Sequence, residues 1–174
     1  MLPSWKAGRS LGLLVLPLLL SGLGCSKEAI KPSEDSLKIR RVVAFVDRLT
    51  QTYQAKDQAG FLAMVSTDSS ELLSSLSPLL TRDFQSFDEI ELKSIVDRIE
   101  LDKDKVTVVL NWDGEWRDRT RQQLYKEKGV TILRLSESPA LRLVSLEGDP
   151  LFGFSIRHPQ IPADPPTSGN PSNS

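Results

Sequence analysis

Two aspartates and a tyrosine on expected strands are the groups that could do acid–base chemistry: Asp97, Asp113 and Tyr125. Each needs burial or a neighbouring charge to bring its pKa close to neutrality before it can act as a general base or acid. Residues 37–157 contain no histidine, which is the commonest base at neutral pH. The leading catalytic pair among these groups is therefore Asp113 as the base, with Tyr125 on the neighbouring strand to orient it.

Other catalytic and metal-binding patterns are missing from the chain. It has no glycine-rich phosphate loop and no CxxC, HExxH or GxSxG motif. Its one histidine, His158, lies at the edge of a proline-rich tail and lacks the further ligands that a metal site needs. We therefore expect no catalytic residue, no metal and no cofactor, and we expect that the protein is not an enzyme. An enzyme that uses Asp113 and Tyr125 is the alternative.

Trp112 and Trp116 form a second feature of interest. They are four residues apart on an expected strand, so both side chains point to the same face, with about 13 Å between them at ~3.3 Å per residue. Such a pair can line an apolar ligand cavity or close the core against helices. We assign Trp112 to the core and leave both roles open for Trp116. With Asp113 and Tyr125, they make up the candidate pocket.

Cys25 is the one cysteine among 174 residues, and it ends a distinctive amino-terminal stretch. Lys6 and Arg9 come first, the apolar run Leu11–Leu20 follows, and small residues precede the cysteine. This order is typical of a secretory signal. Residues 11–24 number 14, fewer than the roughly 20 apolar residues that cross a membrane.

The pair Gly24-Cys25 resembles the cleavage site of bacterial lipoprotein signals, although Gly22 and Leu23 depart from the usual residues. The resemblance implies cleavage before Cys25, a lipid on its thiol and acylation of the new amino terminus, for example with palmitate. The membrane is then a partner of the protein. Ser26 implies the outer membrane of the cell envelope, with the protein facing the periplasm. An ordinary signal peptide with an incidental cysteine is the alternative.

The composition beyond the signal indicates one domain of ordinary size. Removal of residues 1–24 leaves 150 residues, and the loss of Lys6 and Arg9 takes the net charge from −1 to −3. No basic stripe remains, so we expect no nucleic-acid partner. The last 17 residues include five prolines and little apolar content, which is typical of disorder. The chain thus divides into a signal peptide 1–24, a tether 25–36, a domain 37–157 and a disordered tail 158–174.

The first half of the domain has helical periodicity. Apolar residues recur at helical spacing between Leu37 and Lys56, with Ser36 as a plausible N-cap. Asp57 can cap a second, shorter helix. A third helical stretch carries Leu72, Leu73 and Leu76. Ser77-Pro78 is typical of a cap followed by proline at the first helical position, so a fourth helix is expected there.

The second half has the two-residue period of strands. The expected strands are Ile90–Leu101 with a bulge near its middle, Lys105–Asp118 with a kink or bulge at Asp113-Gly114, Gln122–Leu135 interrupted at Gly129, and Leu141–Leu146. The links between them are short enough for hairpins, which predicts an antiparallel meander. Helices followed by hairpin-linked strands are typical of an α+β domain.

The order of elements resembles the NTF2-like (SnoaL-like, cone-shaped) superfamily across Leu37 to Gly153. The tryptophan-bearing strand, the "VTILRL" strand and the closing "LVSLEGDPLFG" carry this resemblance. It implies amino-terminal helices packed on a curved antiparallel sheet of about four strands. In the members of this superfamily that are enzymes, the catalytic groups lie inside the cone.

Three function classes follow from these observations. The leading one is a lipid-anchored, non-catalytic envelope protein that binds an unknown protein or small-molecule partner through its cone or sheet. The second is a cone-fold enzyme that uses Asp113 and Tyr125. The third is a structural subunit of an envelope complex, assembled through β-sheet pairing.

Overall fold

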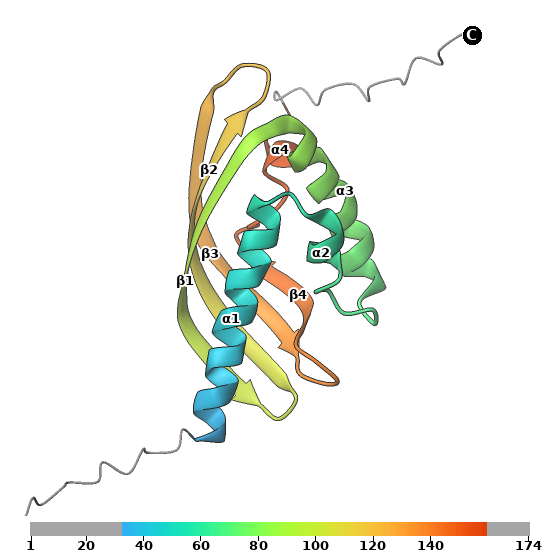
Figure 1. The fold of residues 1–174 in the computed structure, drawn as a ribbon, viewed down its shortest axis with the longest axis vertical. Coiled ribbons are helices and arrows are strands. Elements are labelled where there is room, and N and C mark those ends of the chain that lie inside the picture. The colour runs from blue at the N-terminus through green and yellow to red at the C-terminus, as the bar shows by residue number, and fades with distance from the viewer. Residues whose placement is uncertain (1–32, 160–174) are drawn as a thin grey trace, which may run out of the picture. The chain divides into compact units, whose positions relative to one another are not determined.

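The protein is described here by a computed structural model that covers residues 33–159. Its elements follow in the order α1 (Glu34–Gln54), α2 (Gln58–Leu62), α3 (Ser70–Ser86), β1 (Phe87–Asp102), β2 (Lys105–Asp118), β3 (Leu124–Ser136), β4 (Arg142–Gly148) and α4 (Phe154–Arg157). Helices α1 to α3 lie along one side of a curved sheet (Figure 1). The expected signal peptide, the lipid on Cys25 and the tail from residue 160 onward lie outside the described residues.

The first two helices begin at side-chain caps. α1 begins three residues before the expected start, because Ser33 is its cap and accepts a hydrogen bond from the backbone N–H of Ser36 at 3.2 Å. Glu34 and Asp35 then occupy the first turn, where negative charge is stabilised by the helix dipole. Asp57 caps α2 as predicted and accepts the backbone N–H of Gly60 at 2.8 Å.

Helix α3 is one continuous helix, so the prediction of two helices separated at Ser77-Pro78 is wrong. Pro78 lies inside α3 and faces solvent. A proline in a helix interior costs about 3 kcal/mol or more. The apolar stripe nevertheless keeps its phase across the proline, because Leu76 and Leu80 are both buried. Burial on both sides of Pro78 therefore holds the helix together.

The sheet has the order β1-β2-β3-β4, and every pair is antiparallel. This confirms the predicted α+β class with a four-strand meander. The bulge expected in β1 is present between Val96 and Arg98. β2 has no kink at Gly114, which stays in register between Leu92 and Glu127, and β3 runs through Gly129 without a break.

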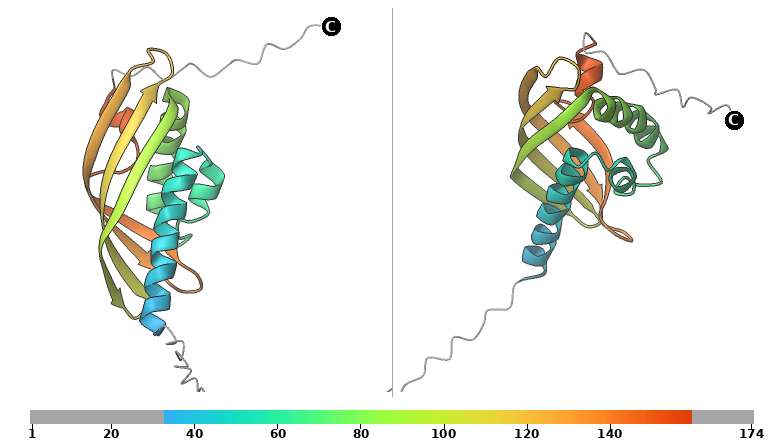
Figure 2. Two further views of the ribbon diagram at one scale, coloured as in Figure 1. Left: turned by 60° about the vertical axis from the view of Figure 1, so that its left-hand side comes forward. Right: turned by 45° about the horizontal axis from the view of Figure 1, so that its top comes forward.

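The core lies between the concave face of the sheet and the helices, as the turned views of Figure 2 show. We call this space the cone interior. Alternate residues of β2 point into it: Val106, Val108, Leu110, Trp112 and Trp116. The intervening residues form the opposite, outer face, and Asp113 lies there between Lys93 and Lys128 on the neighbouring strands. Among residues 33–159 no helix is long and apolar enough to cross a membrane.

Candidate functional site

The two tryptophans of the candidate pocket lie inside the core. Trp112 is 4% exposed and Trp116 is fully buried. Their ring centroids are 6.4 Å apart with the rings nearly perpendicular, at 88°. This separation is about half the spacing of their backbone positions, because the Trp116 ring leans back over Gly114. A Cβ on Gly114 would lie 2.2 Å from the Trp116 ring.

Gly129 has a similar role on the next strand. It pairs with Trp112, and a Cβ there would lie 2.9 Å from the Trp112 ring and 2.6 Å from the side chain of Asp149. Both mid-strand glycines therefore make room for a tryptophan ring inside the cone. We interpreted these glycines as a kink in one strand and an interruption in the next, but their role is to leave space for the tryptophan rings.

Asp113 and Tyr125 do not share a cavity. Asp113 is exposed on the outer face of the sheet, whereas Tyr125 is half-buried on the inner face, opposite Trp116 on the neighbouring strand. Asp97 is exposed as well. Alternate residues of a strand point to opposite faces, so a base at Asp113 cannot be oriented by Tyr125.

Asp83 is a buried carboxylate of the cone interior that no sequence motif revealed. It comes from α3 and is fully buried. Its Oδ2 accepts the hydroxyl of Tyr53 at 2.5 Å and the backbone N–H groups of Gly153 and Phe154 at 2.7 and 3.1 Å. Its Oδ1 accepts the N–H and the hydroxyl of Ser155 at 2.8 and 2.6 Å. One carboxylate thus receives five hydrogen bonds.

Tyr53 extends this network to the sheet. Its hydroxyl accepts a hydrogen bond from the indole N–H of Trp116 at 3.1 Å while it donates to Asp83. Burial raises the pKa of the Tyr53 phenol well above its usual value, and the negative charge of Asp83 raises that pKa further. The phenol therefore stays protonated and acts as a hydrogen-bond donor to the carboxylate.

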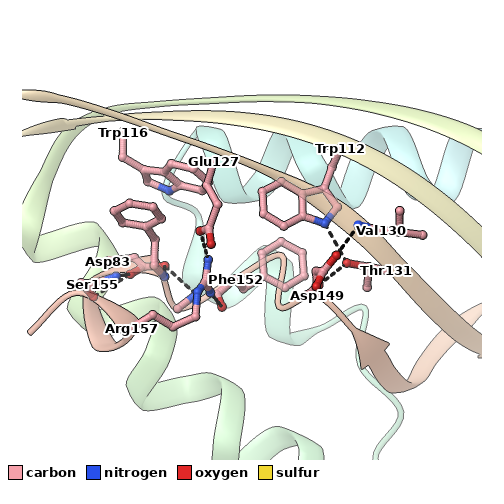
Figure 3. A network of polar contacts seen from close by, with 12 residues as sticks. Asp83, Trp112, Trp116, Glu127, Val130, Thr131, Asp149, Phe152, Ser155 and Arg157 are labelled. Carbon is pink, nitrogen blue, oxygen red and sulfur yellow. Dashed lines mark hydrogen bonds and ion pairs between the residues drawn. The ribbon is translucent and has the colours of Figure 1, made fainter.

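Residues Leu151–Arg157, which we call the C-terminal segment, fill the mouth of the cone next to Asp83 (Figure 3). The Phe154 ring stacks on Trp116 with centroids 4.3 Å apart and an interplanar angle of 16°. Arg157 forms an ion pair with Glu127 of β3 at 2.5 Å. His158, which the sequence analysis placed in the tail, is half-buried, and its ring stacks on Phe154 with centroids 4.2 Å apart.

A second polar chain fixes the residues that lead into the C-terminal segment, as Figure 3 also shows. The indole N–H of Trp112 donates to the hydroxyl of Thr131 at 2.9 Å, and that hydroxyl donates to the carbonyl of Asp149 at 2.5 Å. The carboxylate of Asp149 in turn accepts the backbone N–H of Val130 at 2.9 Å. Both tryptophan N–H groups are therefore satisfied inside the core.

An apolar groove of about 220 Å³ lies beside the C-terminal segment. We call it the α3 groove. Its apolar lining consists of Leu72, Leu76 and Leu79 of α3 with Leu146, Pro150, Leu151 and Phe152, and its polar rim includes Ser75, Thr131, Glu147 and Asp149. Among residues 33–159, four other hollows are larger. Those of about 810, 630 and 530 Å³ are lined mainly by charged and polar side chains, and one of about 330 Å³ combines apolar side chains with three arginines. The α3 groove has the mostly apolar lining that is typical of ligand sites.

No metal centre is built into the part of the chain that the structure describes, because no three His, Cys, Asp or Glu side chains there are placed to share an ion.

Asp83 could have been noticed from the sequence. It stands three residues after Leu80 and seven after Leu76, so the helical period places an acidic residue on the buried face of α3.

No family model and no curated protein matches the chain by sequence. Among solved structures, an NTF2-like superfamily protein from Salmonella enterica serovar Typhimurium is 14% identical, with a TM-score of 0.58 over 66% of this chain and 92% of its own. A conserved protein from Planctomyces limnophilus is 10% identical, with a TM-score of 0.56 over 65% of this chain and 98% of its own. A type 2 hexachlorocyclohexane dehydrochlorinase (LinA) is 10% identical, with a TM-score of 0.55 over 68% of this chain and 86% of its own.

The dehydrochlorinase overturns one expectation. We predicted from the missing histidine and motifs that the protein is not an enzyme, but the same fold carries an enzyme among its structural neighbours. At these identities the likeness extends to the fold and leaves the reaction open. What the geometry and the comparisons show together is that residues 33–159 adopt the NTF2-like α+β cone fold.

Proposed function

We propose that the protein is a lipid-anchored binding protein of the cell envelope, whose NTF2-like domain binds a compact apolar group in the α3 groove. The observation that carries the binding role is the lining of this groove by seven apolar residues from α3 and residues 146–152. Its volume of about 220 Å³ lies below the ~300–1,000 Å³ of drug-sized sites, so the group it takes is small.

Polar side chains accompany the apolar lining of the groove. Ser75 is exposed at the edge of the groove, and its hydroxyl donates to the carbonyl of Leu72. Glu147 of β4 and Asp149, which follows β4, also line the groove. An apolar body with a polar end, such as a short alcohol or an aliphatic side chain of a partner, fits this arrangement. Its apolar part would gain about 25 cal/mol for each Å² removed from water.

A matched pair of substitutions tests the groove. Ser75→Trp should fill it from the solvent side, whereas Ser74→Trp adds the same ring to the neighbouring exposed position, whose hydroxyl bonds the preceding turn in the same way. Cyclohexanol is the probe, followed through the leucine methyl signals in ¹H–¹³C spectra. We expect Ser75→Trp to weaken binding at least tenfold and Ser74→Trp to leave it unchanged. Equal affinity in both variants contradicts the proposal.

The anchor is tested separately in cells. The observation that supports a lipid anchor is the position of Cys25 at the end of the signal-like stretch. Each buried CH₂ of an acyl chain contributes ~0.8 kcal/mol, and a single chain binds a membrane only marginally. Stable anchoring therefore needs two chains. A fatty-acid analogue should label the wild-type protein. Cys25→Ser should abolish the label and release the protein from membranes. The control Ser26→Ala should keep the label and the membrane attachment. Label that persists in Cys25→Ser excludes the anchor.

A further inference from the structure

β4 is an edge strand, because the order β1-β2-β3-β4 gives it a single neighbour in the sheet (Figure 1). The N–H of Asp149 donates to the carbonyl of Val130, and the pairing of β4 with β3 continues in register from this point. Residues of an antiparallel strand that bond the neighbouring strand alternate with residues that do not. The backbone N–H and carbonyl of Leu146 therefore point away from β3, and no residue in 33–159 forms a hydrogen bond with them.

The beginning of the same edge is paired by the chain itself. Residues 64–66 run parallel to β4 and form a β-bridge between Val65 and Leu143. The N–H of Leu143 donates to the carbonyl of Met64 at 2.9 Å, and the N–H of Ser66 donates to the carbonyl of Leu143 at 2.8 Å. After Ser66 the chain leads into α3. The edge thus accepts an extended segment, and the described chain supplies one at Leu143 but not at the later positions of β4.

Open space lies beside the unpaired part of this edge. The α3 groove and the hollow of about 530 Å³ both have Leu72, Ser75 and Leu146 in their lining, so the two adjoin each other. Together they extend along β4 from Val144 to Gly148, and we call this combined space the β4 channel. An extended peptide in the channel would bond Leu146 through its backbone and place an alternate side chain over the apolar lining of the α3 groove.

The other edge of the sheet differs in its charge. Many exposed side chains of β1 are charged: Asp88, Glu89, Glu91, Lys93, Asp97, Arg98, Glu100 and Asp102. Charged side chains and bulges prevent edge strands from pairing with other chains, and β1 has both. Between residues 143 and 148, β4 has one charged residue, Glu147, and its carboxylate is paired with Arg134 of β3. This part of β4 therefore lacks the protection that β1 has.

We propose that β4 is the docking edge for an extended peptide segment of a partner protein, which adds a strand to the sheet and places one apolar side chain in the α3 groove. This inference rests on the proposed binding role of that groove and names the class of its ligand. Backbone hydrogen bonds to the edge supply affinity, and the groove selects the side chain. Its small volume suits one compact aliphatic side chain, such as that of leucine.

Hydrogen exchange of the Leu146 amide tests the pairing in the full chain. The probe is the capped pentapeptide Ser-Thr-Leu-Thr-Ser, and its control carries N-methyl groups on the leucine and on the threonine after it. These groups remove the donor to the carbonyl of Leu146 for either strand direction and keep every side chain. The probe should slow exchange of the Leu146 amide at least tenfold, whereas the amide of Glu147, which faces β3, should not change. The control should bind at least tenfold more weakly.

A second control has alanine in place of the leucine and should also bind at least tenfold more weakly, because it leaves the α3 groove empty. Equal affinity of either control overturns the proposal. Protection of the Leu146 amide in the free protein overturns it as well, because the chain would then cover its own edge. Cyclohexanol separates the pairing from the groove, since it enters the groove without bonding the edge. If cyclohexanol binds and the probe does not, the docking edge is refuted and the groove proposal stands; if neither binds, both are refuted.

Discussion

The strongest prediction concerns the free energy of unfolding after Asp83→Ala. The substitution removes the acceptor of five hydrogen bonds, those from Tyr53, Gly153, Phe154 and the N–H and hydroxyl of Ser155. Hydrogen bonds to charged groups contribute about 1.5–3 kcal/mol each, but the variant also recovers the cost of burying a carboxylate, which is several kcal/mol. Each buried donor left without an acceptor costs about 1–3 kcal/mol, so after that recovery we expect a net loss of about 3–5 kcal/mol.

The size of this loss makes it easy to measure. It is a large part of the ~5–15 kcal/mol that stabilises a typical domain, and it corresponds to a fall in Tm of roughly 10–20 °C. Urea unfolding followed by far-UV circular dichroism is the assay. Asp113→Ala, which removes an exposed carboxylate from the outer face, is the matched control and should leave the unfolding midpoint unchanged.

The network also predicts coupling between residues. Ser155→Ala removes one donor to Asp83 and should cost about 1 kcal/mol in the wild type. In the Asp83→Ala background the same change should cost nearly nothing, because its partner is already gone. A loss below about 1 kcal/mol for Asp83→Ala, or additive effects of the two substitutions, would refute the assignment of Asp83 as the centre of this hydrogen-bond network.

Three further predictions concern the core around this site. Trp112→Ala should cost about 3–5 kcal/mol in urea unfolding, because the side chain is 4% exposed; a change below about 1 kcal/mol would place it on the surface. Gly114→Ala should cost about 1–3 kcal/mol, because its Cβ would meet the Trp116 ring, and this cost should largely vanish in a Trp116→Leu background. The pKa of Tyr53 in the folded state is raised above its usual 10.0, so the protonated phenol contributes fully to the free energy of unfolding below pH 10. Above pH 10 this contribution falls by about 1.4 kcal/mol per pH unit. Tyr53→Phe should lack this fall, and identical pH profiles of stability for the two proteins would contradict the assignment.

Several features of the fold could be predicted because they depend on short stretches of sequence. The change from helical to two-residue periodicity near residue 88 separates α3 from β1 within one or two residues. The shift of apolar positions within β1 predicts its bulge at Val96 and Arg98, and Asp57 predicts the start of α2. Short links between strands predict the order β1-β2-β3-β4. Each of these signals lies within a few residues of the structure that it specifies.

The errors arose where a local signal has more than one solution. Serines at 33 and 36 are both suitable caps, and the hydrogen bond between them decides in favour of Ser33. Ser77-Pro78 has the pattern of a helix start, yet burial of Leu76 and Leu80 carries α3 through it. Gly114 and Gly129 break strand propensity, and only the packed rings of Trp116 and Trp112 show that the glycines make space.

By itself the sequence determined the class of the fold, the order of its elements, the signal-like stretch before Cys25 and the inward face of the tryptophan-bearing strand. Only the tertiary structure decided that Asp83 is the centre of a buried hydrogen-bond network. Its partner Tyr53 is 30 positions away and its partner Ser155 is 72 positions away. Periodicity encodes which face of one element is buried, but it contains no information about which buried faces meet. That information appears when the curved sheet closes over α1 and α3 and the C-terminal segment enters between them.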